Sequence, residues 1–245
     1  MNSIISRTIK IINCILKPVG AKIINRRADN FDMYSAIKRI HDHGIRIDNI
    51  IDIGGSNGIW SINAMKRFPS ASFVAIEPLM ERKESLCNLA QKFPNFSFEL
   101  CAAGEADGDK AMLNISDDLD GSMINGQGGE SRQVPVKTID AIVSQRKLTG
   151  TFLLKFDTHG YELPILKGAR QTLNKTSIII MEAYNFQISD NALRFHEMCA
   201  HMESLGFRCY DIADLMLRDY DKSFWQVDLF FCRNDEKIFE YPHYK

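Results

Sequence analysis

Apolar residues follow two patterns along the chain: short uninterrupted runs, and longer stretches in which they recur every three or four positions. The runs are typical of buried β-strands, and the recurring stretches are typical of amphipathic helices. Seven strands are expected, at 50–53, 72–76, 96–103, 151–156, 177–181, 207–212 and 225–232. Helices are expected at 30–43, 59–66, 80–92, 140–146, 163–173 and 192–205. This alternation predicts an α/β fold with a doubly wound, mostly parallel sheet and a late antiparallel strand.

Residues 104–133 follow neither pattern, because they are polar and rich in glycine. A connection of this length inside a compact domain is usually functional or mobile. We expect residues 121–123 to close over a binding site. The acidic run Asp117-Asp118-Leu119-Asp120 is interpreted as a solvated loop, and no metal site is expected.

The first expected strand leads into a glycine-rich turn, and a helix follows at once. Asp52 lies at the end of the strand, and the turn is Gly54-Gly55-Ser56-Asn57-Gly58. Glycine permits a tight turn and a close approach to a ligand, and the free N–H groups of the helix point into the same corner. Dinucleotide-binding proteins usually show G-x-G-x-x-G here, which this turn lacks. The acid and the turn therefore favour S-adenosyl-L-methionine, a ligand with a ribose and an amino acid group.

A second carboxylate follows the next strand. Glu77 lies 23 residues after Gly54, close to the ~20 residues typical of an acid that binds a ribose diol. A carboxylate can accept hydrogen bonds from both ribose hydroxyls. The small Ala102, near the end of the third strand, would let an adenine ring lie against the backbone. The candidate cofactor-binding residues are Asp52, Gly54, Gly55, Ser56, Asn57, Gly58, Glu77 and Ala102.

Two more acids follow strands later in the chain. Asp157 comes after the fourth expected strand and Glu182 after the fifth. Ligands of doubly wound sheets bind outside the carboxyl ends of the strands. Acids at four such ends, counting Asp52 and Glu77, favour a ligand-binding edge over an ordinary set of turns.

Six stretches of the sequence resemble the FkbM family of S-adenosylmethionine-dependent methyltransferases. They are IDIG with SNG at 51–58, EP at 77–78, LKFDTHGYEL at 154–163, LKGA at 166–169, Glu182 and QVD at 226–228. The resemblance covers residues 45–233 and implies a class I methyltransferase fold. It also implies O-methylation of a hydroxyl on a sugar, a glycan or a natural product. Members usually carry Glu or Gln where His159 stands, which leaves the identity of the base open.

The chemistry implied by this resemblance needs a group that removes the proton of the acceptor hydroxyl. We expect Asp157 and His159 to lie near the donor methyl, with Glu182 as a further candidate. A histidine has a reference pKa near ~6.5, which suits base catalysis at neutral pH. Two structural alternatives remain: His159 as a polar turn residue, and Asp157 as a helix cap.

Composition narrows the function classes. The chain has 245 residues, six cysteines and a formal charge of -1, so it lacks the basic signature of a nucleic-acid-binding protein. The cysteines form no C-x-x-C pair, which favours a reduced, cytoplasmic protein. Two other functions stay open: a nicotinamide-dependent oxidoreductase on the same fold, and a catalytically silent binding module.

Residues 1–28 form a separate basic segment that precedes the catalytic domain expected at 29–245. The segment carries six Lys and Arg residues and no acid, and its apolar residues recur at helical spacing. It lacks the uninterrupted ~20-residue apolar stretch of a transmembrane helix. One interpretation is a peripheral contact with an anionic membrane surface, where the acceptor would be lipid-linked. The other is a helix packed on the domain or an unstructured tail.

Overall fold

The computed structural model describes residues 31–126, 130–190 and 192–244. The basic segment 1–28 lies outside these residues, so its proposed membrane contact stays a prediction. Among the helices of the described ranges, none is both long and apolar enough to cross a membrane.

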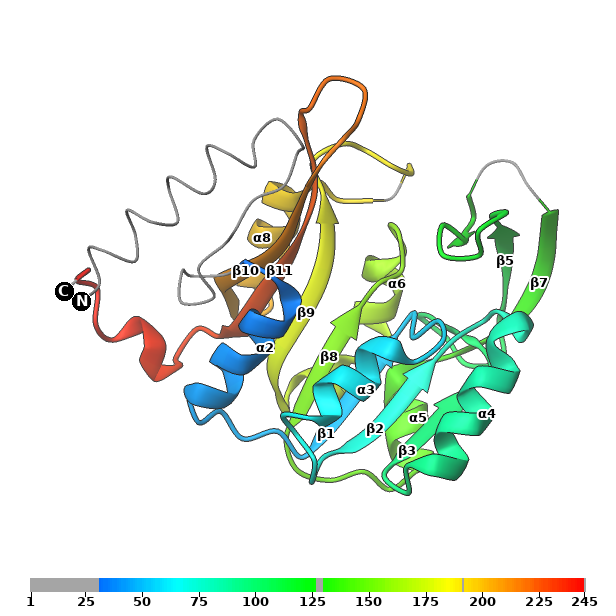
Figure 1. The fold of residues 1–245 in the computed structure, drawn as a ribbon, viewed down its shortest axis with the longest axis horizontal. Helices are drawn as coiled ribbons and strands as arrows, with labels where there is room; N and C mark the ends of the chain where they lie inside the picture. The colour runs from blue at the N-terminus through cyan, green and yellow to red at the C-terminus, as the bar shows by residue number, and fades with distance from the viewer. Residues whose placement is uncertain (1–30, 127–129, 191, 245) are drawn as a thin grey trace, which may run out of the picture.

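Seven strands form the central sheet (Figure 1). They are β1 (Asn49–Ile53), β2 (Ser72–Ile76), β3 (Phe96–Glu99), β8 (Phe152–Phe156), β9 (Thr176–Tyr184), β10 (Phe207–Leu217) and β11 (Phe224–Arg233). Their order is β10-β11-β9-β8-β1-β2-β3. β11 pairs antiparallel with both neighbours, and the other pairs are parallel. The predicted doubly wound sheet with a late antiparallel strand is therefore confirmed.

Helices cover both faces of this sheet, and each face has its own apolar core. On one face lie α2 (Met33–Asp42), α3 (Ile59–Met65) and α4 (Lys83–Lys92), which follows a short 3₁₀ turn at Met80–Arg82. On the other lie α5 (Ile139–Gln145), α6 (Glu162–Lys167), α7 (Arg170–Leu173) and α8 (Phe195–Ser204). A last 3₁₀ turn occupies Lys237–Phe239. Because both faces are buried, the central strands are apolar throughout rather than alternating.

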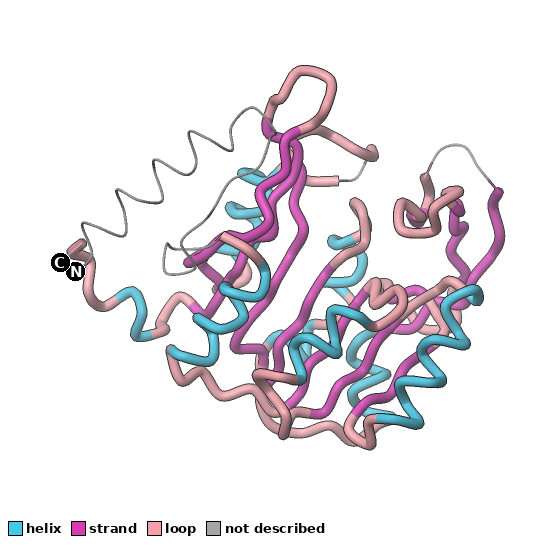
Figure 2. The backbone as a smooth tube through the Cα atoms, viewed as in Figure 1, coloured by secondary structure: helices cyan, strands magenta, loops and turns pink. Residues whose placement is uncertain are grey.

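A second, four-stranded sheet replaces most of the connection predicted at 104–133 (Figure 2). Its strands are β4 (Ala102–Ala103), β5 (Lys110–Ile115), β6 (Met123–Ile124) and β7 (Glu130–Lys137), in the order β4-β7-β5-β6. The prediction of a structureless connection was wrong, because the strands are held by pairing and by a small apolar cluster of their own. Ala102 therefore belongs to the second sheet and not to the end of β3.

Three element boundaries also differ from those predicted. The helix expected at 163–173 is broken at Gly168, where a Cβ atom would lie 2.0 Å from the carbonyl oxygen of Gly104. The helix expected at 192–205 begins only at Phe195. β9 continues two residues beyond Glu182, because β11 pairs with it as far as Tyr184. Glu182 is thus inside a strand and not after its end.

The chain reverses its winding direction between β1 and β8, which lie side by side in parallel register. Such a switch point leaves a crevice at the carboxyl ends of the two strands. The turn after β1 crosses this crevice at Gly54, whose φ is +76°. A Cβ atom at this position would lie 1.9 Å from the carbonyl oxygen of Asp157, so only glycine allows the two strand ends to approach so closely.

Candidate active site

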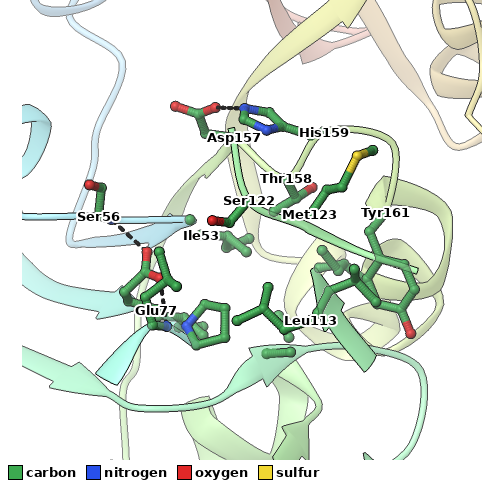
Figure 3. Close-up of a pocket in the computed structure, with 18 of the residues that line it drawn as sticks. Ile53, Ser56, Glu77, Leu113, Ser122, Met123, Asp157, Thr158, His159 and Tyr161 are labelled. Carbon is green, nitrogen blue, oxygen red and sulfur yellow. Dashed lines mark hydrogen bonds and ion pairs between the residues drawn. The ribbon is translucent and has the colours of Figure 1, made fainter. Parts of the chain in front are cut away.

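A cavity of about 340 Å³ occupies this crevice (Figure 3). The main sheet contributes the ends of β1, β2 and β8, and the second sheet contributes Ala102, Leu113 and Met123. The segment after β8 closes the remaining side with Tyr161. The second sheet is therefore a wall of the site, as expected of the 121–123 stretch.

Seven of the predicted site residues line this cavity. They are Gly54, Ser56, Glu77, Ala102, Asp157, His159 and Glu182. The glycine turn and the β2 end bring the first three together, and the β8 and β9 ends bring the last three together. Sequence reasoning thus placed the two ends of the cavity correctly, and their roles in binding or catalysis stay predictions.

Four predicted cofactor residues do not line the cavity. Asp52 is completely buried and accepts a hydrogen bond from Ser61 Oγ at 2.7 Å. The Asn57 side chain accepts from the backbone N–H of Ile59 at 3.1 Å.

The two glycines of this group are pressed against neighbouring side chains. A Cβ atom on Gly55 would lie 2.9 Å from Ala75 Cβ, and one on Gly58 would lie 2.4 Å from Leu89 Cδ1. Gly55 and Gly58 therefore shape the turn, together with Asn57, rather than its ligand-facing wall.

Glu77 stands at one end of the cavity with only 4% of its surface exposed. Its carboxylate accepts the backbone N–H of Ser56 at 2.7 Å and that of Leu79 at 2.8 Å. Burial raises the pKa of Glu77, and these two N–H groups oppose that shift. Each carboxylate oxygen has two acceptor sites, so the group can still accept ligand hydroxyls.

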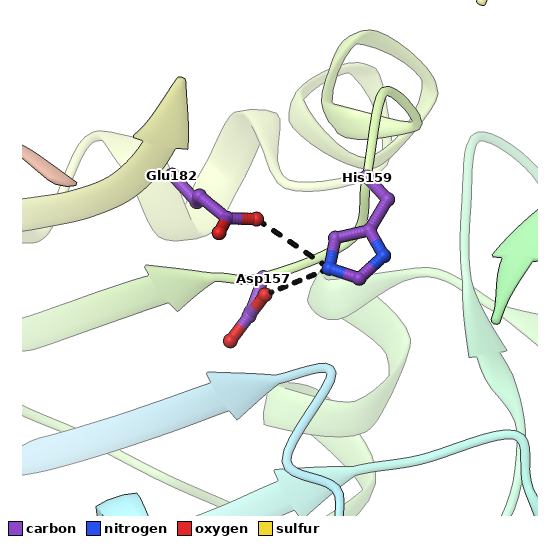
Figure 4. A group of neighbouring side chains, drawn as sticks. All are labelled: Asp157, His159 and Glu182. Carbon is purple, nitrogen blue, oxygen red and sulfur yellow. Dashed lines mark ion pairs between the residues drawn. The ribbon is translucent and has the colours of Figure 1, made fainter. Parts of the chain in front are cut away.

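Three side chains meet at the other end of the cavity (Figure 4). His159 Nε2 lies 3.3 Å from Asp157 Oδ1 and 3.4 Å from Glu182 Oε2. Asp157 also accepts from Lys155 Nζ at 2.7 Å, and Glu182 accepts from the Tyr184 hydroxyl at 2.7 Å and from Gln226. Lys155 thus holds one oxygen of Asp157 and leaves the other for the imidazole, whereas Glu182 Oε2 is shared between the Tyr184 hydroxyl and the imidazole.

Two opposing effects set the pKa of each member of this group. Burial alone would lower the pKa of His159, but the carboxylates of Asp157 and Glu182 outweigh it, so the pKa is raised. Burial alone would raise the pKa of Asp157, but Lys155 and His159 hold it well below its usual range. Burial and the nearby Asp157 charge raise the pKa of Glu182. The group therefore favours an imidazolium over a neutral imidazole.

The turn that carries His159 is built by a buried carboxylate. Glu162, which is 4% exposed, accepts the backbone N–H of Gly160 at 2.9 Å and the Thr158 hydroxyl at 3.0 Å. His159 itself has a φ of +51°, in the left-handed region that non-glycine residues seldom occupy. This backbone conformation turns the imidazole back over the strand ends.

The same three side chains offer ligand atoms that all lie within 4.8 Å of one another. Two carboxylates and an imidazole could also hold a divalent cation, because hard and intermediate metals accept both donor types. The spacing of these residues carries no such indication, since Asp157 and Glu182 are 25 residues apart. The expectation of a metal-free site stays a prediction.

Sequence reasoning missed several residues of the site. Lys155 is 4% exposed, and its Nζ lies 2.7 Å from Asp157 Oδ2 and 3.9 Å from Asp52 Oδ1. A lysine inside an apolar strand was the signal that could have identified it, since buried lysines are usually paired. Asp120 also lines the cavity, where it accepts from Ser56 Oγ at 3.0 Å and from Arg82 at 2.5 Å.

The comparison with protein-family models identifies a methyltransferase domain. The Methyltransferase FkbM domain matches residues 52–209. Among solved structures, a methyltransferase FkbM from Methylobacillus flagellatus KT is 18% identical, with a TM-score of 0.49, over 76% of this chain and 44% of that one. The chain thus spans less than half the length of that protein. No curated protein matches the sequence.

Two further solved structures are similar to this chain at low sequence identity. A putative RNA methyltransferase from Pyrococcus horikoshii is 11% identical, covering 82% of each chain, with a TM-score of 0.46. A 1,6-didemethyltoxoflavin-N1-methyltransferase from Burkholderia thailandensis, solved with S-adenosylhomocysteine, is 11% identical over 82% of this chain and 77% of that one, with a TM-score of 0.46. Because the match to the FkbM domain spans well over half of this chain, the chain belongs to the FkbM methyltransferase family.

Proposed function

We propose that the protein is an S-adenosyl-L-methionine-dependent O-methyltransferase that acts on a hydroxyl of a sugar, glycan or natural product. The observation that carries this proposal is the arrangement of one cavity with a buried carboxylate, Glu77, at one end and the Asp157–His159–Glu182 group at the other. One end suits a ribose, and the other suits removal of a proton beside a reacting methyl.

The cavity fits this cofactor in charge as well as in shape. Its ionisable lining is Glu77, Asp120, Asp157, Glu182 and His159, so carboxylates dominate. A sulfonium and an ammonium group are favoured in such surroundings, whereas a pyrophosphate would be repelled. Apolar walls from β2 and the second sheet would pack against an adenine ring. This charge balance also argues against the nicotinamide-dependent alternative.

When bound, S-adenosyl-L-methionine supplies an electrophilic methyl group. His159 accepts the proton of the acceptor hydroxyl at Nδ1, the ring nitrogen that does not face the two carboxylates, as the new O–C bond forms. Asp157 and Glu182 stabilise the imidazolium that results, because both carboxylates lie within 3.4 Å of Nε2. Lys155 and Tyr184 keep these carboxylates in place. The side chains of the second sheet exclude water from the reacting atoms.

Calorimetric titration of the protein with S-adenosylhomocysteine and, separately, with NAD tests the cofactor assignment. We expect only S-adenosylhomocysteine to bind. Glu77→Ala should weaken that binding by about 2 kcal/mol, because a buried, charged hydrogen-bond acceptor is lost. Circular dichroism controls for folding, since Glu77 also accepts two backbone N–H groups. Unchanged affinity in a folded Glu77→Ala protein, or tight NAD binding, would refute the assignment.

A further inference from the structure

A second cavity shares a wall with the first. It encloses about 960 Å³, and Met123, Ile124 and Tyr161 line both cavities. Gly160 lines the second cavity, and its neighbour His159 lines the first. Figure 3 shows Met123 and Tyr161 at the edge of the first cavity, on the side of His159. The two cavities are therefore adjacent at the turn that carries His159.

The two cavities have opposite charge. Four carboxylates line the first. The second is lined by Lys167 and Arg170, with Asp190 as the single carboxylate among its described lining residues. The remaining ionisable group is His201, whose pKa is lowered by burial and which is therefore mainly neutral at pH 7. A cation is favoured in the first cavity and an anion in the second.

Arg170 is the group most available to such an anion. Lys167 Nζ is engaged by Glu105 at 3.1 Å on the surface, where both side chains are 54% exposed. Within the described ranges, by contrast, the Arg170 guanidinium has no ion-pair or hydrogen-bond partner. A guanidinium presents paired N–H donors that match the oxygens of a phosphate or a carboxylate.

The two cations are separated from the His159 turn along the chain by α6. Both lie at or beyond the far end of α6, a helix of six residues that starts next to the His159 turn. Six helical residues span ~9 Å. Between the two ends, the cavity wall is largely apolar, with Leu163, Pro164 and Leu166 from α6. A ligand that spans this distance has an anionic end, an extended middle and a hydroxyl at His159.

We propose that the second cavity is the acceptor site and that the acceptor carries an anionic group, a phosphate or a carboxylate, which Arg170 binds with support from Lys167. This inference rests on the proposed function, because it places the acceptor hydroxyl at His159. It narrows the acceptor from any hydroxyl compound to an anionic one. A phosphorylated sugar and a lipid-linked sugar phosphate share this chemistry.

Three probes separate these possibilities: glucose 1-phosphate, methyl glucoside and farnesyl phosphate. Each is titrated into the full chain by calorimetry, with and without saturating S-adenosylhomocysteine. The same titrations use Arg170→Met, Lys167→Met, and Lys175→Met as a control, since Lys175 is exposed and lines neither cavity. Cofactor binding is measured first and alone, so that a failure of the proposed function is seen separately.

We expect at least one anionic probe to bind about tenfold more tightly than methyl glucoside, because charge-assisted hydrogen bonds are lost in the neutral compound. Arg170→Met should abolish this difference, Lys167→Met should reduce it, and Lys175→Met should preserve it. Preference for farnesyl phosphate would indicate a lipid-linked acceptor, and preference for glucose 1-phosphate a soluble one. Equal binding of all three probes, or an equal loss in Lys175→Met and Arg170→Met, would overturn the proposal.

Discussion

Replacing Lys155 with methionine tests whether the buried charges of the site are held together as described. Methionine has a similar length and keeps the apolar stem of lysine, so packing changes little while the charge disappears. In the wild-type protein, Lys155 Nζ lies 2.7 Å from Asp157 Oδ2 and 3.9 Å from Asp52 Oδ1. The variant leaves Asp52 without a cation and leaves Asp157 with His159 as its remaining cationic partner.

The magnitude follows from these distances and from burial. Two unit charges 4 Å apart attract by about 4 kcal/mol at an effective dielectric constant of ~20. Part of this attraction offsets the cost of burying the charges, so the measured effect of removing one partner is about 3–5 kcal/mol. Asp52 is completely buried and its second oxygen has no hydrogen-bond partner, which leaves it no alternative cation. We therefore expect Lys155→Met to lose about 3–5 kcal/mol of unfolding free energy at pH 7.

A second change and a change of pH distinguish lost charge from lost packing. Adding Asp52→Asn to Lys155→Met removes the buried charge that has lost its cation, so the double variant should be more stable than Lys155→Met alone. Burial already raises the pKa of Asp52, and Lys155 is the cation that opposes this shift. The stability deficit of Lys155→Met should then shrink as the pH falls from 7 toward 5, because Asp52 takes up a proton in the folded state.

Urea denaturation followed by circular dichroism measures these differences. Lys175→Met is the matched control, because Lys175 is exposed and its replacement should stay within about 0.5 kcal/mol of the wild type. A loss below about 1 kcal/mol in Lys155→Met, or a double variant less stable than the single one, would refute this account of the buried charges.

Three further outcomes are expected. His159→Gln should bind S-adenosylhomocysteine as the wild type does and turn over roughly 10²- to 10⁴-fold more slowly. The wild-type rate should rise with pH through a His159 pKa above ~6.5. If the variant keeps full activity and the acid limb of its pH–rate profile does not move, the base is Asp157 or Glu182. The same raised pKa means that the charged His159 stabilises the fold fully below pH ~6.5 and that this stabilisation is lost as the pH rises through the folded-state pKa. The unfolding free energies of the wild type and His159→Gln should therefore differ more at pH 6 than at pH 9. Dialysis against a chelator should leave the rate of methyl transfer unchanged if His159 acts as the base. Loss of activity that one divalent metal restores would instead identify Asp157, His159 and Glu182 as metal ligands.

The central sheet could be predicted because its strands are buried on both faces. Such strands are apolar at every position, so their number and order along the chain are visible in the sequence. The second sheet has exposed faces, and β5 carries only two buried residues, Ala111 and Leu113, with the exposed Met112 between them. Its glycine- and aspartate-rich neighbourhood therefore resembles a loop, and pairing with β7 decides the structure.

The residues at the two ends of the site could likewise be predicted from the sequence, but the contacts that connect them could not. Glu77, Asp157 and His159 follow strands directly, so their positions are implied by the topology. Lys155 and Asp52 are more than 100 residues apart and become neighbours only through the β1–β8 register. The extension of β9 past Glu182 depends on β11, which comes more than 40 residues later. Long-range pairing of this kind leaves no local trace in the sequence.

At position 159, the residue that best suits the backbone conformation differs from the residue that the proposed catalysis requires. Its left-handed conformation, with a φ of +51°, costs a non-glycine residue roughly 1–2 kcal/mol. Glycine would relieve this strain. His159→Gly therefore removes the imidazole contacts and at the same time leaves an unstrained turn. Directed evolution for heat resistance alone would tend to accept glycine here, whereas selection for turnover would restore a proton acceptor. Residue 159 should therefore serve as an internal reporter of which property a laboratory selection has rewarded.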